Sequence, residues 1–166
     1  TLHKGGLTTL GKVMRLDSLD MMGTPVDYVN RRGGEPGMNI NGFAGSARLH
    51  RKIIWREEDL RTHFWPRFEF GRTSNTHESV GVITRDFGHA LTNNSMGMWF
   101  MAMAGNAAFH QNAMMETIGQ TARAAHESEK KDRSSVAEVA LILDEKSLLR
   151  LSTQAGQFID EHCWGT

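Results

Sequence analysis

The chain has 166 residues, 39% hydrophobic and 23% charged, a composition typical of one globular domain or of parts of two. Its 19 basic and 19 acidic residues balance, so no net field attracts nucleic acid or an anionic membrane, and neither is expected as a partner. The single cysteine, Cys163, excludes an intrachain disulfide and gives no sign of an oxidising compartment, which slightly favours the cytoplasm.

In the first half of the chain, helical and strand-like patterns alternate around a glycine-rich break. In chain order we expect a loose helix over residues 1–24, a short strand at Val26–Val29, a loop at Arg31–Gly37, a short helix over residues 43–50 and a buried strand at Lys52–Trp55. The last of these is brief, β-branched and aromatic, as is typical of a strand covered on both faces.

The second half continues the alternation. We expect a long loop at Phe64–Thr76, a helix from about His77 to Leu91 with Thr76 as its N-cap, a strand at Met96–Met103, an amphipathic helix from Asn112 to about Lys131, a strand at Ala137–Asp144 and the start of a further helix. The longest apolar run, residues 96–104, is too short to cross a bilayer. This order of elements predicts an α/β fold with a parallel sheet and crossover helices.

Functional groups of parallel α/β folds gather where the strands end, and one strand end here is acidic. Glu57, Glu58 and Asp59 follow the strand at Lys52–Trp55, so at least one carboxylate points toward the mouth of the sheet. Arg61 lies close enough in sequence to keep such a carboxylate ionised and oriented, as a glycosyl-transferring nucleophile requires. On spacing alone, the acids fit the start of a helix at least as well.

The same region resembles the seventh strand of (β/α)8-barrel glycoside hydrolases, above all the β-galactosidase-like enzymes of glycoside hydrolase family 42 and its clan. The residues that carry this resemblance are Ser46-Ala-Arg-Leu-His50-Arg-Lys52-Ile-Ile-Trp55-Arg-Glu57-Glu-Asp59-Leu-Arg61-Thr62, where relatives have a lysine, a short apolar strand and Glu-x-Asp-x-Arg-Thr. Val26-Asp27-Tyr28 with Arg31-Arg32-Gly33-Gly34 resembles the sixth strand and its loop, and Gly97-Met98-Trp99-Phe100 resembles the eighth strand. Val139–Asp144 resembles the first strand of the glutamine-amidotransferase-like domain that follows such barrels.

The resemblance implies a domain division and a set of site residues. Residues 1–134 would be the C-terminal part of a barrel, with strands six to eight, and residues 135–166 would begin a second α/β domain. Glu57 would be the nucleophile of a retaining glycoside hydrolase, with Arg61 orienting it. Substrate-binding roles would fall to Trp99, Asp59, Arg32 and Tyr28. The acid/base carboxylate, roughly 5 Å from the nucleophile in such enzymes, would lie outside this chain, which we expect to be a fragment.

Other functions stay open at this point. Relatives often carry an acid soon after the eighth-strand tryptophan, whereas this chain has Ala102 and Ala104, which motivates a non-catalytic carbohydrate-binding or assembly protein on the same scaffold. Trp99 also fits a core position equally well, and an unrelated α/β domain is a third reading. The expected partners are a carbohydrate and the rest of the barrel, with a homo-oligomer as a further option.

No metal or cofactor is expected. None of the eight histidines falls at a spacing used by metal ligands. The pairs Met96-x-Met98 and Met101-x-Met103 resemble thioether ligands for copper, but the same spacing describes one packed face of a strand, the commoner use of methionine.

Overall fold

A computed structural model describes residues 9–25, 31–37, 44–66, 71–93, 97–100, 108–140, 142 and 144. The chain divides into two compact units, which we describe separately. The first comprises Thr1–Asp20, Asn41–Lys52 and Ser134–Thr166, and the second comprises Met21–Ile40 and Ile53–Arg133.

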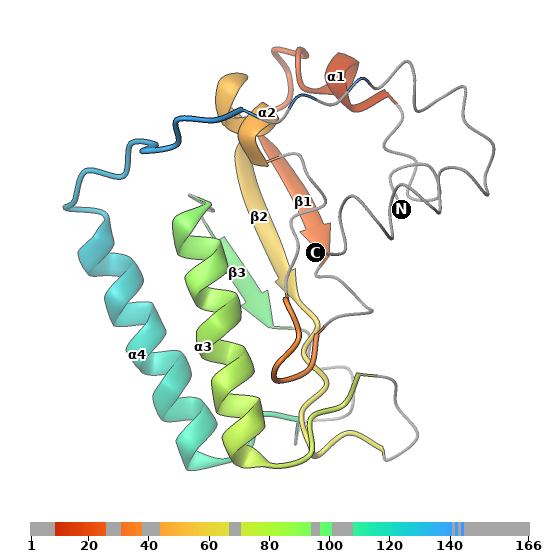
Figure 1. Cartoon of the computed structure of the whole chain (residues 1–166), viewed down its shortest axis with the longest axis vertical. Helices are drawn as coiled ribbons and strands as arrows, with labels where there is room; N and C mark the ends of the chain where they lie inside the picture. Colours follow the sequence, from red (N-terminus) through yellow and green to blue (C-terminus); the bar gives the residue numbers. More distant parts are fainter. Residues whose placement is uncertain are drawn as a thin grey trace. The chain divides into compact units, whose positions relative to one another are not determined.

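The second unit contains a three-stranded parallel sheet in the order β1–β2–β3 (Figure 1). Its strands are β1 (Met21–Pro25), β2 (Ile53–Glu58) and β3 (Gly97–Phe100). The central strand, β2, pairs with β1 from Met21↔Ile53 to Pro25↔Glu57, and with β3 from Trp55↔Gly97 to Glu58↔Phe100. The α/β class with parallel strands is therefore confirmed, while no closed barrel is seen among the residues described.

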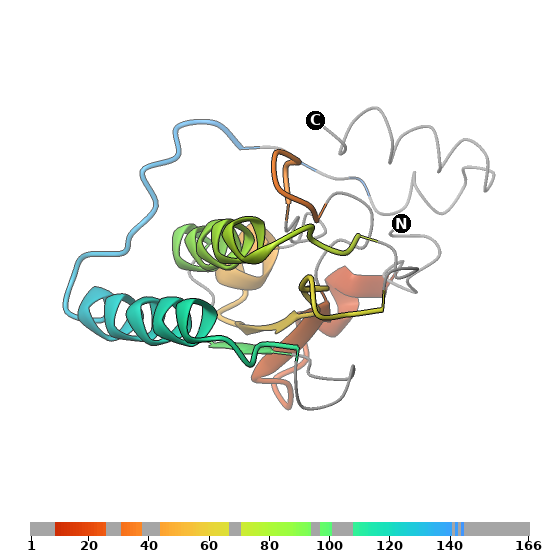
Figure 2. The same cartoon turned by 90° about the horizontal axis from the view of Figure 1, so that it is seen from below.

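Two long helices complete this unit, α3 (Thr76–Thr92) and α4 (Asn112–Ser128), and they run side by side in both views (Figure 1, Figure 2). Asn75 caps α3 by accepting a 2.9 Å hydrogen bond from the Glu78 N–H, so the cap is one residue before the expected Thr76. The buried residues of α3 recur at spacings of three and four along one face. Together with Leu60 and Met114, Val82 and Ile83 of this face form the apolar core.

The first unit contains two short helices, α1 (Leu10–Val13) and α2 (Ala44–Leu49). The end of α2 reverses the chain: Arg51 has a left-handed φ of 56°, and the Lys52 N–H donates to the Ala47 carbonyl at 2.8 Å. These are the features of a Schellman cap, normally made with glycine. The Lys52 ammonium is anchored by the Leu16 carbonyl at 2.8 Å.

Three sequence-based expectations are wrong. Among the described residues of the expected helix over residues 1–24, which begin at Thr9, only Leu10–Val13 form the α-helix α1. Met21–Pro25 form β1 instead, because their backbone hydrogen-bonds to β2. The strand expected at Val26–Val29 is not counted among these errors, because it lies outside the described residues. The acids after Trp55 do not begin a helix, since β2 continues to Glu58.

The strand expected at Ala137–Asp144 is the third error. Its described residues, 137–140, 142 and 144, form no strand. Val139 is 88% exposed and Ile142 is 87% exposed. An apolar run becomes a strand only where a neighbour accepts its backbone hydrogen bonds, and none does so within the described part of the chain. The same described part contains no helix with the length and apolar character needed to cross a membrane.

Candidate functional site

The last two residues of β2 point to opposite faces of the sheet. Side chains alternate along a strand, and in β2 the residues Ile54, Arg56 and Glu58 are buried on the face where Glu58 meets Asp86 of α3. Trp55 and Glu57 lie on the other face, where the Trp55 side chain is 39% exposed. Of the two glutamates, Glu58 is on the face covered by α3 and Glu57 is on the opposite face.

Glu57 is half-buried at the carboxyl end of the central strand. Partial burial, and then the negative charge of Asp59, raise the pKa of the Glu57 carboxyl above its ordinary value. In the sheet register its backbone lies between Pro25 of β1 and Trp99 of β3. The fold therefore brings the backbones of two sequence-predicted site residues, Glu57 and Trp99, next to each other.

Asp59, directly after β2, is clamped between two arginines. It is only 3% exposed, and Arg31 from the loop after β1 donates through Nη1 to its carbonyl at 2.7 Å and approaches its Oδ2 at 3.5 Å. Arg61 donates to the same Oδ2 at 3.1 Å, with its guanidinium 4.0 Å from the centre of the Trp65 ring. Arg61, expected to orient Glu57, thus makes this charge-assisted hydrogen bond to Asp59.

Between β2 and α3 lies a cluster of four ionisable side chains: Arg56 and Glu58 of β2, and Arg85 and Asp86 of α3. Arg56, Glu58 and Asp86 are buried, and the Arg85 side chain is 20% exposed. Burial raises the pKa of the Glu58 carboxyl well above its ordinary value, and neighbouring Asp86 raises it further. Burial lowers the pKa of Arg56 to about 10, although Asp86 and Glu58 act in the opposite direction. Arg85 donates through Nε to Asp86 Oδ1 at 2.8 Å. The cluster thus sets two arginines, one of them partly exposed, against two buried carboxyl groups.

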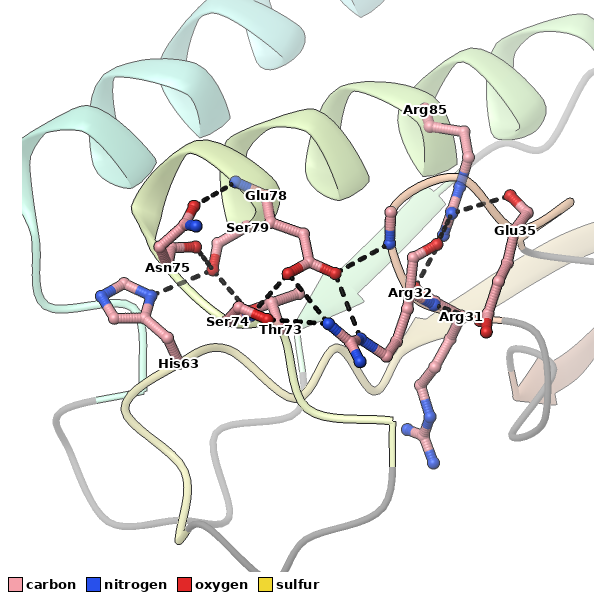
Figure 3. A network of polar contacts seen from close by, with 11 residues as sticks. Arg31, Arg32, Glu35, His63, Thr73, Ser74, Asn75, Glu78, Ser79 and Arg85 are labelled. Carbon is pink, nitrogen blue, oxygen red and sulfur yellow. Dashed lines mark hydrogen bonds and ion pairs between the residues drawn. The ribbon is translucent and has the colours of Figure 1, made fainter.

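Arg85 also fastens the loop after β1 to α3 (Figure 3). Its Nη1 donates to the carbonyls of Arg32 and Glu35, at 2.7 Å and 3.2 Å, and its Nη2 donates to the carbonyl of Arg31 at 3.0 Å. Gly37 follows with a φ of 82°, and a Cβ there would collide with the Arg85 guanidinium. Glycine at this position therefore lets the loop adopt a left-handed φ and close around Arg85 without displacing the guanidinium.

Glu78, in the first turn of α3, also contacts this loop, through Arg32 and Gly33. Its carboxylate accepts from the N–H groups of Ser74 at 2.6 Å and Gly33 at 3.1 Å, and the Arg32 side chain donates to both of its oxygens, at 3.2 Å and 3.3 Å (Figure 3). Burial raises the pKa of Glu78, but these hydrogen bonds outweigh it and hold the pKa at about 2. Arg32, expected to bind substrate, is engaged with Glu78.

Replacing Glu78 with glutamine should destabilise the protein by about 2 kcal/mol at neutral pH, because hydrogen bonds to an ionised acceptor become weaker ones. The folded-state pKa of about 2 lies below the ordinary 4.5, so Glu78 contributes stability that is complete above pH 4.5 and is lost as the pH falls toward 2. Urea unfolding at several pH values measures the difference. Glu116→Gln, on the exposed side of α4, is the matched control. A Glu78→Gln deficit that stayed constant down to pH 2 would contradict this account.

A histidine–serine pair lies beside Glu78. His63 Nδ1 is 3.1 Å from Ser79 Oγ, which resembles a base next to a nucleophile (Figure 3). Ser79 is fully buried, however, and also bonds to Thr73 Oγ1 at 2.7 Å and to the Asn75 carbonyl at 3.0 Å. Burial, and then the Arg72 charge, lower the pKa of His63. The pair therefore ties the loop before α3 to its first turn.

Sequence reasoning missed the buried cluster under α3. One signal was available: Asp86 falls four residues after Val82 and three after Ile83, on the apolar stripe of α3, and Arg56 stands inside a buried strand. A charge on each of two facing apolar surfaces indicates a pair.

Tyr28, which was expected to bind substrate, lies outside the described residues.

The described residues include no group of three or more His, Cys, Asp or Glu side chains placed to hold a metal ion. Comparison with protein-family models, curated proteins and solved structures found no match for this chain.

Proposed function

We propose that this chain supplies the nucleophilic carboxylate, Glu57, of a retaining glycoside hydrolase, and that β1, β2 and β3 are consecutive strands of its (β/α)8 barrel. The observation that carries the proposal is the direction of Glu57. In a barrel the helices cover the outer surface of the strands. Substrate binds at the carboxyl ends of the strands, where it contacts side chains that face the barrel axis. Glu57 is at that end of β2 and faces away from α3, whereas Glu58 lies beneath the helix.

The chemistry follows from this position. The ionised Glu57 carboxylate attacks the anomeric carbon while an acid outside this chain protonates the departing glycosidic oxygen. Water then cleaves the resulting glycosyl ester on Glu57. The residue outside this chain that first acted as the acid now acts as the base and deprotonates this water. Trp55 lies on the same sheet face, two residues before Glu57, and its partly exposed ring offers an apolar surface to sugar C–H groups.

Mechanism-based labelling of the full-length protein tests the assignment. A 2-deoxy-2-fluoro glycoside with a good leaving group slows the second step, so the sugar should remain on the nucleophile, and peptide mapping should find it on Glu57. A label on Glu58, or on a carboxylate elsewhere in the protein, would overturn the proposal. If aryl glycosides were neither hydrolysed nor able to label the protein while carbohydrate still bound, the non-catalytic alternative would hold instead.

A further inference from the structure

The clamp on Asp59 joins the two strand-end loops next to Glu57. Arg31 comes from the loop after β1, and Asp59 and Arg61 come from the loop after β2. Gly71 packs against the Arg31 side chain. The φ of Gly71 is 67°, and a Cβ on Gly71 would lie 2.6 Å from Arg31 Nε. No other residue fits so close to the guanidinium without displacing it.

Arg31 is in turn held from its backbone. Its carbonyl accepts from Arg85 Nη2 at 3.0 Å, and Arg85 is bonded through Nε to Asp86 in the buried cluster. The position of Asp59 is thus fixed by an unbroken series of contacts that reaches α3. Both guanidinium groups lie within 3.5 Å of the same oxygen, Asp59 Oδ2, so the carboxyl group is held by two residues from different loops.

We propose that Asp59 is a positioning residue: held by Arg31 and Arg61, it fixes the chain where β2 ends and keeps a negative charge beside the Glu57 carboxyl. Asp59 is two residues beyond Glu57, so a shift in one moves the other. The register neighbours of Glu57 on β1 and β3, Pro25 and Trp99, carry no charge. Among the described residues, Asp59 is the charged group that raises the pKa of Glu57. The catalytic part of this inference rests on the proposed function of Glu57.

The charge effect can be measured without any substrate. In full-length protein with ¹³C-labelled glutamate carboxyls, the Glu57 signal is assigned by its loss in Glu57→Gln and then titrated by NMR. Asp59→Asn keeps the size of the side chain but removes its charge, so the pKa of Glu57 should fall toward 4.5. Asp59→Glu keeps the charge and should retain the raised pKa. Glu78→Gln removes another arginine-paired carboxylate, away from Glu57, and should leave the titration unchanged.

Arg61→Gln should shift the pKa of Glu57 in the opposite direction to Asp59→Asn. Its side chain is partly exposed, and its removal leaves the Asp59 charge less neutralised, so the pKa of Glu57 should rise. This variant decides the matter if Asp59→Asn does not fold. A Glu57 titration that stays in place in Asp59→Asn, or fails to rise in Arg61→Gln, would overturn the inference.

Activity then separates this inference from the proposed function. Asp59→Asn should lower kcat by roughly tenfold to a hundredfold through misplacement of Glu57, with a smaller change in KM. It should also move the acid limb of the pH profile to lower pH, which a purely structural loss would not do. If the NMR shifts occur but the full-length protein hydrolyses no glycoside, the positioning of Glu57 stands and its proposed chemistry fails.

Discussion

Replacing Glu57 with glutamine should abolish glycoside hydrolysis by the full-length protein, with a loss in kcat on the order of 10⁵-fold. Glutamine has the size of glutamate but cannot form a glycosyl ester at a useful rate, so the first chemical step is lost. Steady-state hydrolysis of an aryl glycoside measures the effect. Azide, added as an external nucleophile, should restore part of the rate and yield a glycosyl azide if the glutamine still leaves the site accessible.

Glu58→Gln is the matched control, because it makes the same change one residue further along the same strand. Glu58 is buried beneath α3, on the face of the sheet opposite to Glu57, so its carboxyl group does not face the proposed substrate site. This variant should keep kcat within a few-fold of wild type. Full loss of activity in Glu58→Gln, together with an active Glu57→Gln, would show that the orientation argument is wrong.

The pH dependence of wild-type activity should also reflect the ionisation of Glu57. The Glu57 carboxyl must be ionised to attack, and its pKa is raised by partial burial and by Asp59. Activity should therefore fall on the acid side with an apparent pKa above 4.5, the ordinary value for a glutamate.

The sequence was sufficient for those parts of the fold that local patterns determine. The helices α3 and α4 start within a residue of where their periodicity placed them, since a long apolar stripe can be buried only as a helix. The strand β1 could not be found in this way. Met21–Pro25 include a glycine and a proline and have little strand propensity of their own, so their conformation comes from pairing with β2, which is remote in sequence.

The candidate site shows the same division. Three acids at a strand end indicated a functional edge, but the direction of each carboxylate depends on how far the strand continues. That length is set by pairing of Glu58 with Phe100, 42 residues later, which no local pattern reveals. The contact of Arg31 with Asp59 joins residues 28 apart, so the holding of Asp59 between two arginines was equally hidden. Local patterns identified the acidic strand end, but only strand pairing and long-range contacts showed that Glu57, Glu58 and Asp59 lie in different environments.

The largest loss of stability should come from Arg56→Met. Arg56 and Glu58 are each about 1% exposed, and Asp86 lies against both. Removing Arg56 leaves two buried carboxyl groups with Arg85 as the remaining arginine of the cluster, and an uncompensated buried charge costs about 3–5 kcal/mol. Arg32→Met is the control, since the Arg32 side chain is 45% exposed and its ion pair with Glu78 is worth about 1 kcal/mol. Urea unfolding of both variants measures the contrast.

Two further measurements separate lost charge balance from lost packing. Glu58 has a folded-state pKa above its ordinary 4.5, so its ionisation lowers stability as the pH rises, and the Arg56→Met deficit should be smaller near pH 4.5 than at pH 8. Adding Glu58→Gln to Arg56→Met should restore part of the loss, because the cluster then has one carboxylate, Asp86, opposite one arginine. A deficit independent of pH and unchanged by Glu58→Gln would mean that Arg56 stabilises the sheet through the packing of its aliphatic stem, and that the interior of this unit does not depend on balanced charge.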